Sequence, residues 1–411
     1  MLHLGQRLAA EGVAVRVLAP HAAGLPSQET LGGLPVRRFR YAPAAWERLA
    51  YRGAMHDLAT ASWANRLLLG SFLASFLLAT LAAISSQSPV LSPQSPVAAS
   101  RTGDRRLGTE DWGLGTENWR LLHAHWWFPA GLVGAVASIL GGLPLVVTCH
   151  GTDVALLRQY RLARPLARAV LRRAAAVTVV SADLRDSLIA LAGVEAAKIS
   201  VIPMPVHPAI EATLPLAGGG QGGGVGPPTI LAVARLAKDK GLDVLLEACG
   251  FLRARGLDCR LALVGEGEEE AALRAQAQRL GLSESVDFLG AVAPGDLAPH
   301  YLAADVVVLP SRREGLGLVL VEALFCRRPV IATRVGGIPD VVADGQTGLL
   351  VPPDDPLALA EAIARLLNDP ALAARLAAAG HEHVRQHFSG QVVAQRMVDV
   401  YRQVLGGCQQ G

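Results

Sequence analysis

The chain contains few of the residues that mark several large classes of protein. Only three of its 411 residues are lysine and 5% are aromatic, and 38 Lys and Arg residues face 35 Asp and Glu residues, which leaves a net charge of +3. A protein that binds nucleic acid usually shows a clear excess of basic residues. We therefore expect no nucleic-acid partner.

Cysteines are also sparse and irregularly placed. The five cysteines are odd in number and lack C-x-x-C spacing, whereas disulfide frameworks and zinc sites need a regular pattern. The opening stretch MLHLGQRLAAEG has no apolar core of the length that a signal peptide needs. These features favour a protein of the reducing cytoplasm.

One long uncharged run stands out. The segment LLLGSFLASFLLATLAAI, residues 67–84, has 18 residues without a charge, which is borderline for a membrane span. A buried or interfacial helix of an α/β protein can be equally apolar, so these interpretations stay open. The nearby Arg48, Arg52 and Arg66 suit a helix that rests on a bilayer. Peripheral association with the inner face of the cytoplasmic membrane is therefore an alternative to a purely cytoplasmic location.

The abundant residues indicate the fold class. The hydrophobic fraction is 51%, and aliphatic runs alternate with segments of helical periodicity, as in doubly wound α/β domains. In the first half we expect strands at 13–20, 121–127, 143–151, 175–181 and 199–205. In the second half we expect strands at 229–235, 259–265, 286–292, 305–311, 329–335 and 348–353, followed by helices at 356–368, 370–386 and 390–406.

The two halves meet at the glycine-rich stretch LAGGGQGGGVGPP, which is typical of a linker. The predicted organisation is an N-terminal domain at 1–208, a linker at 209–228, a C-terminal domain at 229–388 and a final helix at 389–411 that packs back on the N-terminal domain.

The N-terminal half has two irregularities. Residues 87–118 combine SPVLSPQSPV with the near-duplicates LGTEDWG and LGTENWR, and we interpret them as a low-complexity insertion. The chain also begins with a helical pattern that leads into a strand, whereas a doubly wound domain normally begins with a central strand. That first strand is missing from the pattern.

The segment EGLGLVLVE contains the residues that are best suited to bind a charged ligand. A buried strand at 305–311, a glycine-containing turn and an apolar helix from Leu318 form an anion site, because free N-H groups and the helix dipole point at the crevice. Glu322 lies inside the helix, where an unpaired carboxylate costs several kcal/mol. Paired hydroxyls of a ribose would satisfy Glu322, and those of a sugar beyond the phosphates would suit Glu314.

The segment around these glutamates, residues 304–342, resembles the C-terminal domain signature of the family 4 retaining glycosyltransferases. It carries the two glutamates eight residues apart together with EGLGL, PVIAT and GGIPD in one register. Within this segment the sequence departs from the family pattern where Leu316 replaces Phe, Arg327 replaces Gly and Asp340 replaces Glu, and outside it Met204 and Pro205 replace the family's Asn-Gly. The resemblance implies the GT-B fold, in which two Rossmann-like domains face each other across a cleft.

The resemblance also implies roles for the nucleotide half. Arg235 and Lys240, on the loop after the domain's first strand, would neutralise the departing diphosphate. Main-chain groups near Gly265 and Gly290 would cradle the nucleotide base. The turn and helix start that hold the diphosphate comprise Gly315, Leu316, Gly317 and Leu318.

In the N-terminal half, polar residues follow two neighbouring strands. His125 in LLHAHWW and the turn His150-Gly151-Thr152-Asp153 resemble the positions of the family that face the sugar and the acceptor. The implied catalytic set is therefore His125, His150, Asp153 and Glu314. Trp126 and Trp127 could stack on an acceptor sugar or pack within the protein.

The sequence thus predicts a cytoplasmic hexosyltransferase of polysaccharide synthesis, which acts with retention on a glycan or lipid-linked acceptor. The donor would be a UDP- or GDP-sugar. No cofactor and no metal are expected, because no D-x-D occurs near a strand end. The alternatives are a GT-B sugar-nucleotide epimerase, a truncated homologue that acts as a binding subunit, and, least favoured, a membrane-embedded structural protein.

Overall fold

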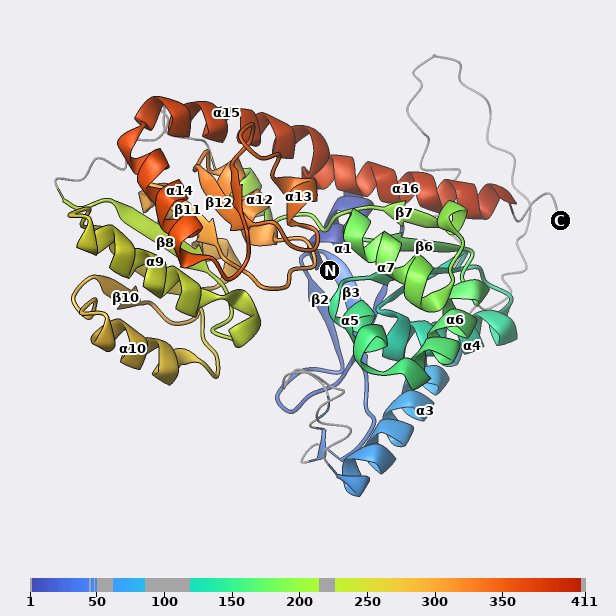
Figure 1. Ribbon diagram of the computed structural model, residues 1–411. Helices are drawn as coiled ribbons and strands as arrows, with labels where there is room; N and C mark the ends of the chain where they lie inside the picture. Colours follow the sequence, from blue (N-terminus) through green and yellow to red (C-terminus); the bar gives the residue numbers. More distant parts are fainter. Residues whose placement is uncertain are drawn as a thin grey trace, which may run out of the picture. The chain divides into compact units, whose positions relative to one another are not determined.

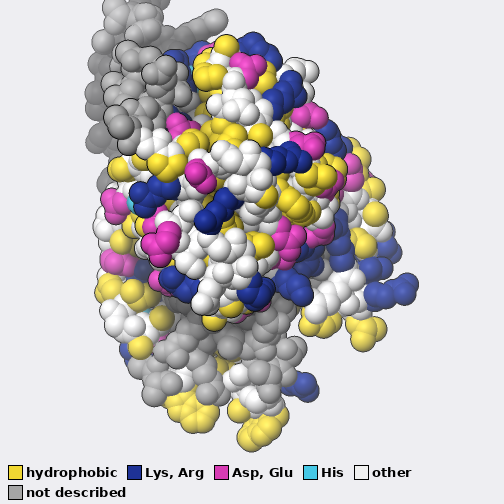
Figure 2. Space-filling view, turned by 60° about the vertical axis from the view of Figure 1, so that its left-hand side comes forward, with side chains coloured by type: hydrophobic (Ala, Val, Ile, Leu, Met, Phe, Trp, Pro, Cys, Tyr) yellow, Lys and Arg dark blue, Asp and Glu magenta, His cyan; other side chains and the backbone are white. Residues whose placement is uncertain are grey.

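The computed structural model of the chain (Figure 1) describes residues 2–43, 46, 47, 49, 62–85, 119–213 and 226–407. The insertion predicted at 87–118, the glycines of the predicted linker up to residue 225, and Arg48 and Arg52 lie outside these residues. The chain divides into two compact units: unit 1 comprises Met1–Thr178, Leu188–Ser200 and Ala394–Gly411, and unit 2 comprises Val179–Ser187 and Val201–Val393. On the face shown in Figure 2, basic and acidic side chains are interspersed.

Unit 2 is built on a six-stranded sheet of order β10-β9-β8-β11-β12-β13, in which every neighbouring pair is parallel. The strands are β8 (Thr229–Val233), β9 (Arg260–Val264), β10 (Val286–Phe288), β11 (Val306–Leu309), β12 (Val330–Thr333) and β13 (Leu349–Val351). All six lie within the runs predicted from the sequence. Because β8 and β11 are parallel neighbours, the loops that follow them leave the same edge of the sheet.

Helices cover both faces of this sheet. Helices α9 and α14 pack together on one face, while α12 packs against α15 and α8. Asp355 and Asp369 cap α14 and α15 by accepting 2.9 Å hydrogen bonds from the N-H groups of Ala358 and Leu372, which explains why both helices begin at an Asp-Pro pair. The helices of unit 2 are α8 (Pro208–Glu211), α9 (Leu242–Ala254), α10 (Glu270–Arg279), α11 (Ala298–Ala303), α12 (Leu318–Phe325), α13 (Ile338–Val341), α14 (Pro356–Asn368) and α15 (Pro370–His387), with 3-10 turns η6 (Lys238–Lys240) and η7 (Pro294–Asp296).

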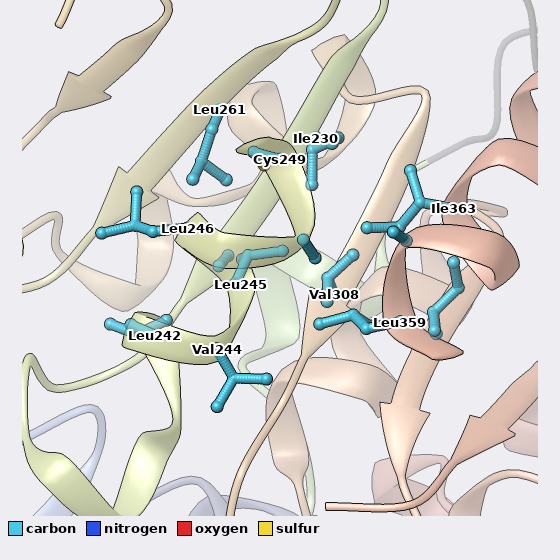
Figure 3. Close-up of a cluster of buried hydrophobic side chains, with 14 of the residues drawn as sticks. Ile230, Leu242, Val244, Leu245, Leu246, Cys249, Leu261, Val308, Leu359 and Ile363 are labelled. Atoms are coloured by element: carbon cyan, nitrogen blue, oxygen red, sulfur yellow. The ribbon is translucent and has the colours of Figure 1, made fainter. Parts of the chain in front are cut away.

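The core of unit 2 fills the space between α9, α14 and the sheet (Figure 3). Leu245 of α9 and Ile363 of α14 are fully buried, together with Ile230 of β8, and Leu359 of α14 lies beside Val308 of β11 (Figure 3). Burial of each such side chain stabilises the folded protein by about 1.5–3 kcal/mol. This core holds the strand ends, and therefore the loops beyond them, in fixed places.

Unit 1 contains two sheets. The four-stranded sheet has the order β4-β5-β6-β7, and the three-stranded sheet has the order β1-β3-β2, with β1 and β3 parallel and β2 and β3 antiparallel. The strands are β1 (Val17–Pro20), β2 (Gln28–Leu31), β3 (Leu34–Phe39), β4 (Leu122–His125), β5 (Leu145–Cys149), β6 (Ala176–Val179) and β7 (Ile199–Val201). The parallel sheets with covering helices confirm the predicted α/β class.

The hairpin of β2 and β3 was not predicted. Its strands QETL and LPVRRF alternate exposed residues with partly or fully buried ones instead of forming an apolar run. Gly32 and Gly33, which join them, both have positive φ values of 53° and 84°. A Gly-Gly pair between alternating segments is a known hairpin signal, so the sequence did contain it.

The helices of unit 1 begin with α1 (Leu2–Ala10), which precedes β1 as the sequence predicted. The others are α3 (Trp63–Ser85), α4 (Leu132–Gly141), α5 (Thr152–Gln159) and α6 (Arg164–Arg173), with the π-helical turn η3 (Trp127–Gly131) and the 3-10 turns η4 (Arg161–Ala163) and η5 (Ala196–Lys198). Helix α7 (Ala182–Ala192) belongs to unit 2 up to Ser187 and to unit 1 from Leu188. The chain passes from unit 2 back into unit 1 within α16 (Gly390–Gly407).

Helix α3 contains the uncharged run. Its inner face packs Phe72 and Phe76 on Phe39 of β3, with ring centroids 5.3 and 4.6 Å apart. Its outer face leaves Leu67 and Leu78 exposed by 67 and 68%. By length and composition alone, α3 is the one helix of the described residues that is apolar enough to cross a membrane.

Arg327, which replaces the glycine of the family pattern, lies just after the end of α12. Arg327 follows α12 with a φ of 52°, its N-H bonds to the carbonyl of Leu324, and the N-H of Arg328 bonds to that of Ala323. This pair of bonds is a Schellman motif, in which the left-handed residue is usually glycine. Arg327 thus occupies a backbone conformation that favours the glycine of the family pattern.

Candidate functional site

The centre of the candidate site in unit 2 is an ion pair between Lys240 and Glu314. Lys240 ends η6 after β8, and Glu314 lies on the loop between β11 and α12. The ammonium nitrogen of Lys240 lies 2.8 Å from Oε2 of Glu314, and the two side chains are 19 and 15% exposed. The structure thus brings together two predicted residues that are 74 positions apart in the chain.

Backbone contacts hold Glu314 in place. Its Oε1 accepts a 3.0 Å hydrogen bond from the N-H of Gly315, and its carbonyl accepts one from Gly337. A Cβ added to Gly336, which has a φ of 52°, would lie only 1.9 Å from that carbonyl oxygen. The glycines of GGIPD are therefore needed for the close approach of two loops, a role that the sequence analysis did not assign to them.

The N-terminus of α12 faces the same edge of the sheet. Gly317 precedes the helix in the left-handed conformation, with a φ of 88°, and α12 has no side-chain cap. The first N-H groups of a helix without a cap are available to an anion, and the helix dipole adds to the attraction. Leu316 is buried beside this turn. The leucine that replaces the phenylalanine of the family pattern is therefore an apolar residue of the core.

Glu322 lies one turn into α12 and is 9% exposed. Its Oε2 accepts a 2.6 Å hydrogen bond from the hydroxyl of Tyr301. Burial raises the pKa of Glu322, while the bond from Tyr301 acts in the opposite direction. The sequence predicted that this carboxylate needs donors but did not identify Tyr301, which is 21 residues away on α11.

The residues predicted to face the nucleotide lie at the ends of neighbouring strands. The N-H of Gly265, after β9, donates to the carbonyl of Gly290, after β10, at 2.8 Å. Gly265 has a φ of 135°, and an added Cβ would lie 1.9 Å from the carbonyl oxygen of Ala234. Arg235 follows Ala234, and its side chain is 63% exposed near Asp239. These three predicted residues are thus neighbours along one edge.

In unit 1, two of the predicted residues bond to each other. Nδ1 of His125, at the end of β4, lies 2.9 Å from Nε2 of His150, after β5. Burial is the main cause that lowers the pKa of His150 to about 4 and the pKa of His125 well below its ordinary value. Both imidazoles are therefore neutral at pH 7, and one donates its N-H to the other.

Asp153 is buried beneath this pair. Oδ1 accepts hydrogen bonds of 3.0 Å from the N-H groups of His150 and Gly151, and Oδ2 accepts one of 3.2 Å from Trp127. Burial raises the pKa of Asp153, and these three bonds oppose the rise. The carboxylate thus fixes the His150 turn against the end of β4. Of the two tryptophans, Trp126 is 39% exposed and Trp127 is buried.

A buried polar chain continues from these residues and was not predicted. The ring of His123 stacks on that of His125 with centroids 4.5 Å apart. Its Nε2 lies 2.6 Å from Oγ1 of Thr148, and its Nδ1 lies 2.6 Å from the hydroxyl of Tyr401 on α16. The stretch HAH, with two histidines on the same side of one strand, carried a signal for this arrangement.

The described residues include no group of three or more His, Cys, Asp or Glu side chains that could hold a metal ion.

Family models match both halves of the chain. The model described as Glycosyl transferases group 1 matches residues 222–383, and the model described as Glycosyl transferase 4-like domain matches residues 1–205. These matches agree with the resemblance that residues 304–342 carry.

Two curated proteins illustrate the similarity. The chain is 33% identical over 292 residues to a GDP-mannose-dependent alpha-(1-6)-phosphatidylinositol monomannoside mannosyltransferase of Mycolicibacterium smegmatis, which covers 67% of this chain and 75% of that protein. It is 35% identical over 313 residues to a D-inositol 3-phosphate glycosyltransferase of Acidothermus cellulolyticus, which covers 69% of this chain and 67% of that protein.

Two solved structures share the fold. The sucrose-phosphate synthase of Thermosynechococcus elongatus aligns with a TM-score of 0.74 and 25% identity, over 98% of this chain and 92% of that chain. The HepE protein of Anabaena in complex with UDP aligns with a TM-score of 0.61 and 27% identity, over 69% of this chain and 79% of that chain.

Proposed function

Because the chain belongs to the glycosyl transferases of group 1 and has their GT-B fold, we propose that it transfers a hexose, with retention, from a UDP- or GDP-sugar to a glycan or lipid-linked acceptor. The bond from the anomeric carbon to the diphosphate breaks, the bond to the acceptor oxygen forms, and the hydroxyl proton leaves with the nucleoside diphosphate. The ion pair of Lys240 and Glu314 at the N-terminus of α12 carries this proposal.

The donor groups come from unit 2. The charge that develops on the departing diphosphate is the largest in the transition state, and fixed cations and N-H groups stabilise such charge. Lys240, Arg235 and the N-H groups near Gly317 supply both. The same groups do the work that a divalent metal does elsewhere, so the proposed reaction needs neither a metal nor another cofactor.

The carboxylates would hold the hydroxyl groups of the donor. Glu322 is buried beside the helix N-terminus, and Tyr301 bonds to only one of its oxygens, which supports a ribose as the second partner. Glu314 already has Lys240 as a partner, so the donor sugar would share a charged pair. Charged groups that are fixed before binding cost little reorganisation during the reaction.

The acceptor groups come from unit 1. His125 and His150 are neutral and bonded to each other, and Asp153 fixes the turn that carries His150. Neutral imidazoles suit the binding of sugar hydroxyls, because each can donate one hydrogen bond and accept another. We propose no covalent nucleophile.

The test is a product assay with UDP- and GDP-sugars and a panel of glycan and lipid-linked acceptors. Transfer should occur without added metal and persist in EDTA, and Lys240→Ala and Glu314→Ala should each abolish it, while Arg375→Ala on the exposed face of α15 should act as the wild type. A free sugar without transfer would indicate an epimerase, and nucleotide binding without any product would indicate a binding subunit. Near-normal turnover in both site variants would refute the assignment.

A bilayer contact would bring the enzyme to lipid-linked acceptors. Helix α3 exposes Leu67 and Leu78, and α4, which packs on it, exposes Ile139 and Leu140 by 64% each. Such a surface suits the boundary between lipid headgroups and acyl chains.

A basic segment adjoins this surface. Between residues 154 and 182 the chain has six arginines and no acidic residue, and Leu162 among them is 95% exposed. Arg173 of α6 donates a 3.3 Å hydrogen bond to the carbonyl of Ser138 on α4, so the basic and apolar elements are neighbours. Each arginine near an anionic membrane contributes about 1 kcal/mol. The free thiols of the described cysteines suit the cytoplasmic side of such a membrane.

Vesicle sedimentation tests the membrane contact. The protein should sediment with vesicles that contain phosphatidylglycerol and weakly with phosphatidylcholine alone. Leu67→Ser with Leu78→Ser should reduce sedimentation, and Arg161→Gln with Arg172→Gln should weaken it on the order of tenfold. Leu357→Ser, an exposed leucine of unit 2, is the matched control. Equal sedimentation of all variants would overturn the contact, and resistance to carbonate extraction would indicate a true span.

A further inference from the structure

Arg312 makes more charged contacts than any residue of the candidate site, although nothing in the sequence singled it out. Its two terminal nitrogens donate hydrogen bonds of 2.8 Å to the two carboxylate oxygens of Asp243. Its Nε donates at 2.6 Å to Asp354, and its Nη1 also donates at 2.7 Å to the carbonyl of Lys238. A bidentate arginine-carboxylate pair fixes orientation as well as distance.

These contacts join the two loops that carry the central ion pair. Arg312 lies two residues before Glu314 on the loop after β11, and its own N-H donates to the carbonyl of Asp239 at 2.8 Å. Lys240 is the next residue after Asp239, and Asp243 lies in the first turn of α9. Arg312 therefore holds the segment on both sides of Lys240.

The two loops also touch without any side chain between them. Gly241 has a φ of 64°, and a Cβ added there would lie 2.1 Å from the carbonyl oxygen of Pro310. The side chain of Arg312 is only 24% exposed, so water competes less for its bonds than at an open surface. Backbone contacts and the guanidinium of Arg312 therefore both hold the two loops together.

We propose that Arg312 is a positioning residue of the donor site, which holds the Glu314 loop against the segment of Lys240 so that Lys240 faces the diphosphate and Glu314 faces the donor sugar. This role rests on the proposed function. A loop that is free to move by about 1 Å loses much of the benefit of preorganised charges. All the groups that form the clamp belong to this chain.

Lysine signals provide a readout that does not depend on activity. The chain has only three lysines, at positions 198, 238 and 240, so protein labelled with 13C at the lysine Cε gives three assignable signals. Arg312→Gln should shift or broaden the signal of Lys240 and leave that of Lys198 unchanged. Arg312→Lys keeps the charge but not the bidentate geometry, and it supplies the same test if Arg312→Gln does not fold.

Nucleotide binding provides the second readout. Isothermal titration with UDP, and with GDP in parallel, should show binding weakened by about tenfold in Arg312→Gln and Asp243→Asn, with a smaller loss in Arg312→Lys. Arg260→Gln removes an ion pair of similar length between β9 and β10 and should leave both readouts unchanged. Equal nucleotide affinity and an unmoved Lys240 signal in Arg312→Gln would overturn the positioning role. A wild type that binds neither nucleotide would instead count against the proposed function, while the Lys240 signal would still decide whether the clamp exists.

Discussion

The hydroxyl of Tyr301 and the carboxylate of Glu322 form a 2.6 Å hydrogen bond in which both partners are buried, with 0 and 9% of their surfaces exposed. The bond explains how an apolar helix accommodates a charge. An isolated carboxylate would cost several kcal/mol at this place, and the phenol removes part of that cost. It also leaves the second oxygen of Glu322 for another donor.

Replacement of Tyr301 by Phe should lower the free energy of unfolding at pH 7 by about 1–3 kcal/mol, because Glu322 loses a hydrogen bond in a buried place. The variant should also raise the pKa of Glu322 further, since the lost bond favoured the charged form. Because the pKa of Glu322 is higher in the folded chain than in the unfolded chain, where it is about 4.5, the protein loses stability as the pH rises above about 4.5. The difference between wild type and variant should therefore grow with pH in urea titrations.

The control for this pair is a double-mutant cycle with Glu322→Gln. The amide does not ionise, so the pH-dependent part of the Tyr301→Phe effect should disappear in the Gln background. An effect that is independent of pH in both backgrounds would mean that the bond does not act on the ionisation of Glu322.

The buried histidines of unit 1 predict a loss of stability in mild acid. Burial, with a smaller effect of His150, lowers the pKa of His123 to about 3, and burial lowers the pKa of His150 to about 4. The unfolded chain binds these protons near pH 6.5 and the folded chain does not. The free energy of unfolding should therefore fall as pH drops from about 6.5 toward 4, with a slope of about 1.4 kcal/mol per pH unit for each histidine.

His150→Gln isolates this effect. In the variant, the free energy of unfolding should change less steeply with pH, by the contribution of one proton. The raised pKa values of Asp153 and Glu322 have the opposite effect on stability in acid. Both carboxylates are present in the wild type and in the variant, so the comparison removes their effect. A slope that His150→Gln leaves unaltered would contradict the neutral state of the pair.

Arg327→Gly should stabilise the protein by about 1 kcal/mol, because Arg327 is in the left-handed conformation and its side chain is exposed. Arg375→Gly makes the same chemical change inside α15, at another exposed residue, and should cost about 1 kcal/mol. Urea titrations of the two variants should thus move the midpoint in opposite directions. Destabilisation by both would show that the left-handed backbone at Arg327 carries no strain.

Gly241→Ala should cost about 2 kcal/mol or more beyond the cost of Gly256→Ala. Both glycines have positive φ values, but an added Cβ meets the Pro310 carbonyl at Gly241 and finds nothing within 4 Å at Gly256. The comparison of their urea midpoints therefore measures the contact between the two loops and not the backbone conformation. Equal costs would mean that the loops can move apart freely.

Much of the fold of unit 2 could be predicted from local patterns. Strands such as β11 and β12 are buried on both faces, so they form aliphatic runs that need no tertiary information to recognise. Helices α14 and α15 each begin at an Asp-Pro pair, which marks a helix start in the sequence. The hairpin of β2 and β3 was missed because only one of its faces is buried and polar and charged residues interrupt the apolar ones.

The candidate site was predictable only in part. The glycines and glutamates of EGLGLVLVE mark a strand, a turn and a helix start, which is local information. Tyr301, His123 and Arg312 each act through partners from distant parts of the chain, such as Tyr401, which is 278 residues from His123. No spacing within the sequence connects such pairs.

The sequence by itself determined the α/β class, the strand ends that carry the glycines and the family, because periodicity, turn residues and short motifs are properties of neighbouring positions. The tertiary structure decided which polar groups meet: Lys240 with Glu314, Tyr301 with Glu322, and Arg312 with Asp243. The reason is physical. The order of parallel strands in the sheet sets which loops share an edge, and that order is chosen by packing across the whole unit.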